Sequence, residues 1–279
     1  MKKVYLLGDP VEHSISPQMH NAAYAELGIE YNYEAIKVSL EDLENKVQML
    51  RSSDVAGANI TVPHKEHVIK LLDEIDPNAR SIGAVNTIKN NDGKLIGYNT
   101  DSKGFIDSLK EDGCISPEGK NVMVLGAGGA ARAICVALFT AGVPIIYLFD
   151  IFESKAKILS ADLTSRCKCG AFKIITKEEI NESIMDVELL INASPVGMHP
   201  KFDSCPVPDD APFHKDLFVY DLVYNPSETK LIKLAKAKGS NGITGLGMLV
   251  RQGAASFEIF TGVKPSVDTM FMAARKALS

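Results

Sequence analysis

A short apolar segment that runs directly into a glycine-rich turn constrains the fold of this chain more than any other feature. Residues 121–125 read NVMVL, the run GAGGAA follows at 126–131, and the helical pattern ARAICVALFTAG begins at its last alanine. In a G-x-G-x-x-A turn the first glycine permits the tight bend, and the second lets a pyrophosphate approach the backbone. The phosphates then lie at a helix N-terminus, where free N–H groups favour negative charge. The cofactor-binding residues predicted here are Gly126, Ala127, Gly128, Gly129 and Ala130.

The next apolar segment, IIYLFD, ends on an acid that supports the same interpretation. Asp150 stands 21 residues after Gly129, close to the roughly 20-residue offset of a carboxylate that binds the ribose hydroxyls of a dinucleotide. That carboxylate would repel a 2′-phosphate, and Ile151 and Phe152 supply no guanidinium to hold one. Lys155 lies about one turn into the predicted helix and is a poor substitute. We therefore expect NAD to be preferred and NADP to be possible; a bare βα turn and an exposed acid are the alternatives.

Strand and helix patterns alternate along the whole chain, which is typical of a parallel sheet covered by helices. A stretch with two glycines and a proline, residues 113–119, reads as a linker. We predict an α/β fold of two domains. The first is an α/β substrate-binding domain with a mainly parallel sheet, residues 1–104, joined by the C-terminal helical segment 248–279. The second is a Rossmann dinucleotide-binding domain, residues 105–247.

Local signals give the expected limits of several elements in the first half. Ser16 is expected to cap a helix in which Pro17 is the first residue and which Gly28 ends. His20 would pack on the core side of that helix. Pro63 is expected to open another helix, and AVNTIKN, NDG and KLIGYN in succession predict a hairpin.

Composition and charge narrow the function classes. The chain has 279 residues and a formal net charge of −5, which argues against nucleic acid or an anionic membrane as the main partner. The first apolar run is too short for a signal peptide, and none approaches the roughly 18 residues of a membrane span. The five cysteines are scattered, and Cys167 and Cys169 lack the further ligands of a metal site. We expect a cytoplasmic protein without a metal.

Polar side chains in the first half gather in the segments that follow predicted strands. In an open α/β sheet the ligand crevice lies at the carboxyl ends of the strands, so these side chains are expected to converge. Separately, each serine, threonine or asparagine is also a common cap or turn residue. The residues concerned are Ser14, Ser16, Thr61, Lys65, Asn86, Asn99 and Asp101.

An ordered series of motifs resembles the shikimate dehydrogenase family. The series consists of GDPVEHSISPQMHN, ANITVPHK, GAVNT, NTD, GAGGAA, NASPVGM, YDLVYNPSET and GLGMLVRQGAASFEIFTG. It extends from about Gly8 to Gly262, nearly the whole chain. The resemblance implies an N-terminal substrate domain, a Rossmann domain, and a terminal helix that returns to the first domain. The implied reaction is the reversible oxidation of the shikimate C3 hydroxyl to 3-dehydroshikimate, with hydride passing to a nicotinamide.

The resemblance also implies a role for each matching residue. Lys65 would be the catalytic base, with Asp101 beside it as the second member of the pair. Ser14 and Ser16 would bind the substrate carboxylate. The residues implied to hold ring hydroxyls are Thr61, Asn86 and Asp101, those implied to close the substrate pocket are Tyr224 and Gln252, and those implied to line the nicotinamide end are Ala193, Ser194, Leu222 and Gly245.

The chemistry of the residues is compatible with these roles, because oxidising an alcohol requires a base at the hydroxyl oxygen as hydride leaves carbon. Members of the family that use NADP carry an Asn-Arg-Thr-like run where this chain has Asp150, Ile151 and Phe152, which again favours NAD. Quinate is the alternative substrate, although the Ser14-x-Ser16 pair resembles shikimate-type members. A non-catalytic dinucleotide-binding regulator is a remote alternative. The expected partner is a small molecule, and the chain is expected to be a monomer or a homodimer.

Overall fold

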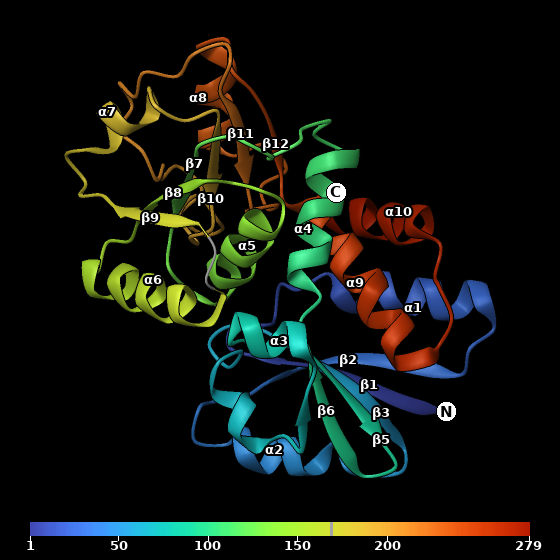
Figure 1. Cartoon of the computed structure of the whole chain (residues 1–279). Helices are drawn as coiled ribbons and strands as arrows, with labels where there is room; N and C mark the ends of the chain where they lie inside the picture. Colours follow the sequence, from blue (N-terminus) through green and yellow to red (C-terminus); the bar gives the residue numbers. More distant parts are fainter. Residues whose placement is uncertain (168–169) are drawn as a thin grey trace. The chain divides into compact units, whose positions relative to one another are not determined.

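The computed structural model describes residues 1–167 and 170–279 and contains two compact units (Figure 1). The first unit comprises Met1–Gly104 and Leu249–Ser279, and the second comprises Phe105–Met248. The chain re-enters the first unit at residue 249, one residue later than the predicted residue 248. Cys169 and the side chain of Cys167 lie outside the described residues, so the expectation for that pair is not addressed by the structure.

The first unit contains a six-stranded sheet in the order β2-β1-β3-β5-β6-β4. Three strand pairs, β1·β2, β1·β3 and β4·β6, are parallel, whereas β3·β5 and β5·β6 are antiparallel, so the sheet is mixed. The antiparallel pair β5·β6 is the predicted hairpin, and its two-residue turn has positive φ at Asp92 and Gly93, as a tight hairpin turn requires. The strands are β1 (Lys2–Gly8), β2 (Tyr31–Lys37), β3 (Val55–Ile60), β4 (Glu74–Ile75), β5 (Thr87–Asn91) and β6 (Lys94–Tyr98).

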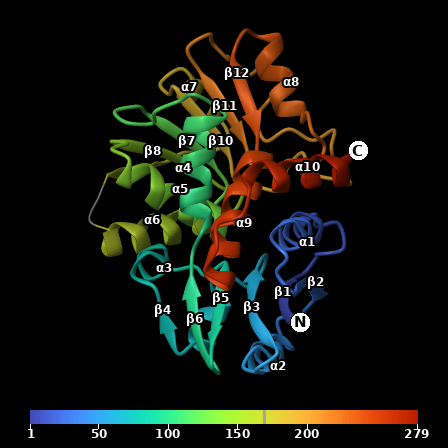
Figure 2. The ribbon, with the colours of Figure 1, turned by 90° about the vertical axis from the view of Figure 1, so that its right-hand side faces the viewer.

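The helices of the first unit come from both ends of the chain, and α10 lies alongside α1 (Figures 1 and 2). Two helices, α4 and α9, cross the limits between the units in sequence. The apolar core of the unit includes Leu7, Val47 and Ile88, which come from two strands and a helix. The helical elements are α1 (Ser16–Leu27), α2 (Leu43–Met49), the 3-10 helix η1 (His67–Leu71), α3 (Pro77–Ile82), α4 (Asp101–Glu111), α9 (Leu246–Thr261) and α10 (Val267–Leu278).

Two local predictions in the first unit are wrong. Ser16 is already the first residue of α1, and Ile15 occupies the cap position; the backbone N–H of Ser16 donates to Ser14 Oγ over 3.3 Å instead. No α-helix opens at Pro63 in the described chain, where turns lead to η1. The backbone N–H of Val85 donates to the carbonyl of Lys65 over 2.8 Å. This carbonyl therefore bonds to a distant segment and not to a residue of a local helix. The prediction that Gly28 ends α1 is correct, since its φ is 63°.

The second unit contains a fully parallel six-stranded sheet in the order β12-β11-β10-β7-β8-β9. This is the strand order of a doubly wound dinucleotide-binding fold, with the topological switch between β7 and β10. Figure 2 shows α8 beside the edge strand β12. The strands are β7 (Val122–Leu125), β8 (Ile145–Phe149), β9 (Ala171–Ile174), β10 (Leu189–Asn192), β11 (Phe218–Asp221) and β12 (Asn241–Thr244). The helices are α5 (Gly129–Thr140), α6 (Glu153–Cys167), α7 (Ile180–Ile184) and α8 (Lys230–Ala237).

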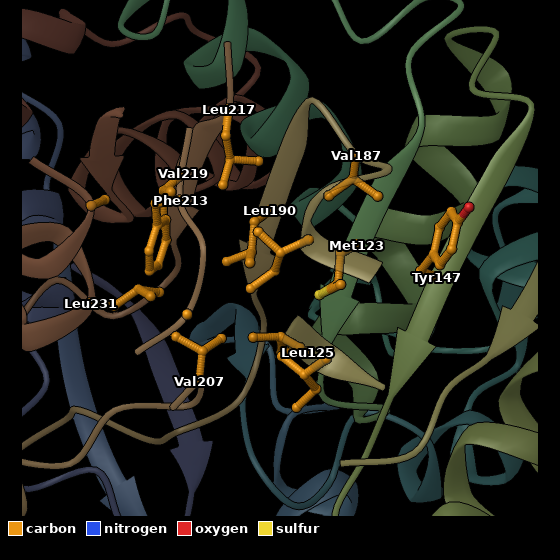
Figure 3. Close-up of a cluster of buried hydrophobic side chains, with 14 of the residues drawn as sticks. Met123, Leu125, Tyr147, Val187, Leu190, Val207, Phe213, Leu217, Val219 and Leu231 are labelled. Carbon is orange, nitrogen blue, oxygen red and sulfur yellow. The ribbon is translucent and has the colours of Figure 1, made fainter. Parts of the chain in front are cut away.

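Apolar side chains on one face of this sheet form a core of their own (Figure 3). Met123, Leu190 and Val219 come from neighbouring strands, and Phe213 and Leu231 pack against them from the segments that cover the face. The central strands are therefore buried along their length, as expected of a parallel sheet covered by helices. Within the part of the chain that the structure describes, no helix combines the length and the apolar character needed to cross a membrane.

Candidate active site

The first unit brings together two charged side chains that are 36 positions apart in the sequence. Lys65 follows β3, and Asp101 is the first residue of α4. Lys65 Nζ donates to Asp101 Oδ2 over 2.6 Å, and the two side chains are only 14% and 6% exposed. An ion pair withdrawn from water to this extent is less screened than a surface pair. The predicted catalytic pair is thus assembled in the fold, and its role in catalysis stays a prediction.

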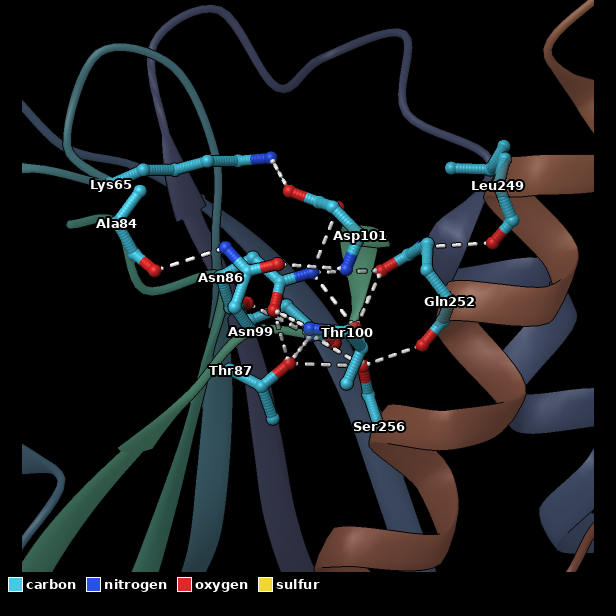
Figure 4. Close-up of polar contacts among 11 residues, drawn as sticks. Lys65, Ala84, Asn86, Thr87, Asn99, Thr100, Asp101, Leu249, Gln252 and Ser256 are labelled. Carbon is cyan, nitrogen blue, oxygen red and sulfur yellow. Dashed lines mark hydrogen bonds and ion pairs between the residues drawn. The ribbon is translucent and has the colours of Figure 1, made fainter. Parts of the chain in front are cut away.

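Two asparagines form hydrogen bonds with Asp101, one with its second carboxylate oxygen and one with its backbone N–H (Figure 4). Asn86 Nδ2 donates to Asp101 Oδ1 over 2.9 Å, while Asn86 Oδ1 accepts the backbone N–H of Thr100 over 2.8 Å. Asn99 Oδ1 accepts the backbone N–H of Asp101 over 3.0 Å, and Asn99 Nδ2 donates to the carbonyl of Ala84 over 2.9 Å. Asn86 therefore orients the carboxylate directly, whereas Asn99 fixes the start of α4 beneath it.

Gln252 of α9 joins the same group from the C-terminal segment (Figure 4). Its Oε1 lies 3.3 Å from Asn86 Nδ2 and 3.4 Å from Thr100 Oγ1, and both atoms donate to it. Its Nε2 donates to the carbonyl of Leu249 over 2.8 Å. The residues after 248 thus contribute a polar side chain to the first unit, next to the Asp101 carboxylate.

The predicted hydroxyl-bearing residues lie where two neighbouring strands end. Ser14 and Ser16 follow β1, and Thr61 follows β3, which is parallel to β1. The backbone N–H of Thr61 donates to the carbonyl of Leu7 over 2.9 Å, so the two segments leave the sheet side by side. Ser14 and Thr61 are half-buried and Ser16 is buried. Their contacts with a substrate stay predictions.

In the second unit the glycine-rich turn has the geometry that a pyrophosphate needs. Gly126 has a φ of 108°, a backbone region that suits glycine, and its N–H donates to the carbonyl of Phe149 over 2.7 Å. A Cβ at Gly126 would lie 3.0 Å from the Ala193 backbone. A Cβ at Gly128 would meet no atom of the described residues within 4 Å, and α5 begins at the next residue. The backbone is therefore open where a helix N-terminus favours an anion.

Asp150 is fixed at the end of β8 by two backbone groups. Its Oδ2 accepts the N–H of Ala127 over 2.8 Å, and its Oδ1 accepts the N–H of Phe152 over 2.9 Å. The next side chain, Ile151, is 82% exposed. Lys155 places its Nζ 5.1 Å from the centre of the Phe152 ring, over its face. Each carboxylate oxygen retains capacity to accept a further hydrogen bond, so ribose hydroxyls can bind to Asp150 as it stands.

The loops after β10 and β11 are tied together by a buried carboxylate. Asp221 Oδ1 accepts from Asn192 Nδ2 over 2.8 Å and from the backbone N–H of Val223 over 3.1 Å, while its Oδ2 accepts from Thr229 Oγ1 over 2.6 Å. Burial raises the pKa of Asp221 to about 6, and these hydrogen bonds oppose that rise. Asn192 Oδ1 in turn accepts the Ser194 hydroxyl over 2.6 Å. The sequence prediction named Ala193 and Ser194 but missed this support.

The remaining predicted residues of the nicotinamide end also lie at this edge of the second sheet. The N–H of Leu222 donates to the carbonyl of Asn192 over 2.9 Å. A Cβ at Gly245 would lie 2.1 Å from the Leu222 carbonyl, so only glycine allows this approach. Tyr224 is half-buried in the same unit, and burial raises the pKa of its hydroxyl. Its predicted contact with a substrate stays a prediction.

Comparisons with known proteins identify the family of this chain. Residues 6–88 match the family model described as the shikimate dehydrogenase substrate binding domain, and residues 245–275 match that of the shikimate 5′-dehydrogenase C-terminal domain. Shikimate dehydrogenase (NADP(+)) of Methanopyrus kandleri is 43% identical over 96% of this chain and 92% of its own length. The chain belongs to the shikimate dehydrogenase family.

Two solved structures of the family extend the comparison to three dimensions. Shikimate 5-dehydrogenase from Thermus thermophilus, in complex with NADP(H) and shikimate, has a TM-score of 0.88 and is 38% identical, with 100% of both chains covered. Shikimate 5-dehydrogenase from Listeria monocytogenes, in complex with shikimate and NAD, has a TM-score of 0.87 and is 36% identical, with 97% of this chain and 95% of that chain covered. Members of the family have therefore been solved with either dinucleotide.

Proposed function

We propose that this chain is a shikimate dehydrogenase, which oxidises the C3 hydroxyl of shikimate reversibly to 3-dehydroshikimate. The observation that carries the proposal is the buried Lys65–Asp101 pair, which Asn86 orients at the carboxyl end of the first sheet. A bound nicotinamide dinucleotide supplies the acceptor for the hydride. The glycine-rich turn and Asp150 fit such a cofactor, because they offer open backbone for phosphates and a fixed acceptor for ribose hydroxyls.

Within this proposal each site residue of the first unit has a defined role. Lys65, in its neutral form, receives the proton that leaves the C3 hydroxyl as hydride leaves carbon, and Asp101 orients Lys65 and the substrate. Thr61 donates to or accepts from the ring hydroxyls, and Asn86 Nδ2 donates to one of them in place of its 3.3 Å contact with Gln252 Oε1. Ser14 and Ser16 bind the substrate carboxylate through neutral hydroxyl donors. The residues proposed to hold the substrate are Ser14, Ser16, Thr61, Asn86, Asp101 and Gln252.

We also propose that NAD is the preferred dinucleotide, although the curated relatives are named for NADP(+). Both oxygens of Asp150 accept hydrogen bonds from backbone N–H groups. The carboxylate is therefore fixed in a position where its charge would repel a 2′-phosphate. The nearest cation that follows it, Lys155, lies over the Phe152 ring. Lys157 is paired with Glu153 at 2.7 Å. None of these described residues offers the bidentate grip of a guanidinium.

The experiment that tests both proposals is a two-by-two kinetic comparison of shikimate and quinate, each with NAD and NADP, followed by absorbance of the reduced dinucleotide at about 340 nm. We expect the largest kcat/KM for shikimate with NAD. A larger value with NADP would overturn the cofactor assignment, and a larger value for quinate would make quinate the main substrate. Absence of turnover in all four combinations would favour a non-catalytic regulator.

A further inference from the structure

Beneath the Lys65–Asp101 pair lies a set of buried polar side chains to which the proposed chemistry gives no task. Tyr33 comes from β2, Asn59 from β3, Thr87 from β5 and Ser256 from α9, and none is more than 6% exposed. A buried polar group destabilises a fold unless it is hydrogen-bonded, and apolar residues of the same size would fill the space without that requirement. The direction of the hydrogen bonds among these side chains indicates their role.

The direction of these hydrogen bonds is fixed at Asn59, because its Nδ2 lies 3.1 Å from the backbone carbonyl of Asn86, which can only accept. The Tyr33 hydroxyl donates to Asn59 Oδ1 over 2.9 Å. Burial raises the pKa of Tyr33 well above its usual value, so the hydroxyl keeps its hydrogen at neutral pH. Because Asn59 Oδ1 accepts, its Nδ2 must face the other way, and it donates to Thr87 Oγ1 over 3.0 Å and to Ser256 Oγ over 2.9 Å. Ser256 uses its own hydrogen on the carbonyl of Gln252 over 2.9 Å.

The same direction continues to the catalytic pair. The Thr87 hydroxyl donates to Asn86 Oδ1 over 3.0 Å, which also accepts the backbone N–H of Thr100. A backbone N–H can only donate, so the Asn86 amide has one possible orientation, with Nδ2 towards Asp101 Oδ1 at 2.9 Å. Donors and acceptors therefore alternate without a break from Tyr33 through Asn59, Thr87 and Asn86 to Asp101 (Figure 4 shows the part from Thr87 onward).

We propose that Tyr33, Asn59 and Thr87 are positioning residues that act through Asn86 to hold the Asp101 carboxylate against Lys65. Hydrogen bonds that run in one direction polarise one another, which strengthens the last donor in the series. The carboxylate is then gripped at one oxygen by Asn86 and at the other by Lys65. This inference rests on the proposed function, since Lys65 and Asp101 are its catalytic residues.

The test uses substitutions that delete one hydroxyl and keep the shape of the side chain. Thr87→Val removes the link to Asn86, Thr87→Ser restores a hydroxyl there, and Tyr33→Phe removes the first donor. Tyr24→Phe is the matched control: the Tyr24 hydroxyl is equally buried, and among the described residues it has no hydrogen-bond partner. Melting temperatures of all variants show whether each one folds.

We expect Thr87→Val to lower kcat for shikimate about tenfold, the effect of one lost orienting hydrogen bond, while KM for the dinucleotide changes less than about twofold. Tyr33→Phe should lower kcat by a smaller factor, because Asn59 retains its other partners. Thr87→Ser should recover most of the lost kcat, and Tyr24→Phe should match the wild type. A folded Thr87→Val variant with wild-type kcat would overturn the inference, as would an equal loss in Tyr24→Phe.

A second measurement separates this inference from the proposed function. In nitrogen–proton correlation NMR spectra of the free protein, the side-chain amide signals of Asn86 should shift in Thr87→Val and Tyr33→Phe but not in Tyr24→Phe. If the wild type fails to oxidise shikimate, the proposed function is wrong, and these signals still decide whether the series orients Asn86. If the wild type is active but neither kcat nor the Asn86 signals respond, the inference alone is wrong.

Discussion

At the scale of single residues, Lys65 is the side chain on which the proposed reaction depends most. It is largely buried and contacts Asp101 at 2.6 Å. Lys65→Met keeps much of the side-chain volume but removes the group that takes the proton, so kcat should fall by about 10²- to 10⁴-fold, the usual contribution of a general base. KM for shikimate should change much less. Steady-state kinetics at saturating dinucleotide measures both quantities.

A lysine on the exposed face of the same segment supplies the control for this prediction. Lys70 belongs to η1 and is more exposed than Lys65, so Lys70→Met should leave both kcat and KM near their wild-type values. If Lys65→Met retains most of the wild-type turnover, Lys65 is not the base. An equal loss in the Lys70 variant would instead point to general damage to the fold.

Asp150 and Ile151 carry the prediction on cofactor choice. Asp150→Asn with Ile151→Arg removes the charge that opposes a 2′-phosphate and adds a guanidinium at an exposed position. The ratio of kcat/KM for NAD to that for NADP should fall by at least about tenfold, because one charge-assisted contact contributes about 1.5–3 kcal/mol. The single oxygen of asparagine can still accept one of the two hydrogen bonds that Ala127 and Phe152 donate to separate oxygens of Asp150. An unchanged ratio would show that these two side chains do not select the dinucleotide.

At the scale of elements, the sequence predicts those parts of the fold whose signals are local. The glycine turn before α5, the hairpin β5–β6 and the end of α1 at Gly28 follow from backbone requirements that only a few residue types meet. The helix expected at Pro63 does not form, because the carbonyl of Lys65 accepts from Val85, 20 residues away. Such a bond joins distant segments, and no local pattern indicates it.

The same distinction explains which site residues the sequence revealed. Lys65, Asn86 and Asp101 stand in segments that follow strands, and the rule for open α/β sheets finds them there. Asn59 was missed because it lies inside β3, a strand that is buried at every position. An asparagine within a continuous apolar strand was the available signal, since a buried amide needs partners. The identity of those partners, Tyr33 and Thr87 among them, depends on tertiary packing.

The segments that follow β10 and β11 supply a prediction about pH. Burial raises the pKa of Asp221 to about 6 from a usual value of 3.8. The unfolded chain therefore loses this proton at lower pH than the folded chain, so the free energy of unfolding falls as pH rises from about 4 to about 6 and stays lower above that. The full effect is about 3 kcal/mol. Asp221→Asn keeps a neutral acceptor for Asn192 and Val223 and should remove this dependence.

Urea denaturation of wild type and Asp221→Asn at about pH 4.5 and about pH 7.5 measures this effect. The variant should gain stability relative to the wild type as pH increases, by up to about 2 kcal/mol over this interval, in proportion to the protons bound by each state. The absolute stability of the variant is not the test, since any change in packing contributes equally at both pH values. Parallel pH curves for the two proteins would contradict the assigned cause.

At the scale of the whole molecule, each unit has its own apolar core and its own buried titrating group. His20 of the first unit stacks on Tyr33 with ring centres 4.2 Å apart, and burial lowers its pKa to about 3. Its Nδ1 has no hydrogen-bond partner among the described residues. In the unfolded chain His20 has its usual pKa of 6.5, so above that pH it does not lower the free energy of unfolding. As pH falls from 6.5 towards 3, the unfolded chain takes up a proton that the folded chain does not, and the free energy of unfolding decreases. Asp221 of the second unit has the opposite effect, because its raised pKa makes the free energy of unfolding increase as pH falls.

We therefore expect the two units to respond oppositely to acid. Between about pH 7.5 and about pH 5, His20 should lower the stability of the first unit by about 2 kcal/mol, while protonation of Asp221 raises that of the second by about 1 kcal/mol. Hydrogen exchange followed by mass spectrometry, corrected for intrinsic exchange rates, reports protection in each unit separately. His20→Phe retains a stacked ring and should flatten the response of the first unit alone, residues 1–104 and 249–279, and Asp221→Asn that of the second unit alone, residues 105–248. Equal responses of both units in either variant would show that the whole chain unfolds as one cooperative body.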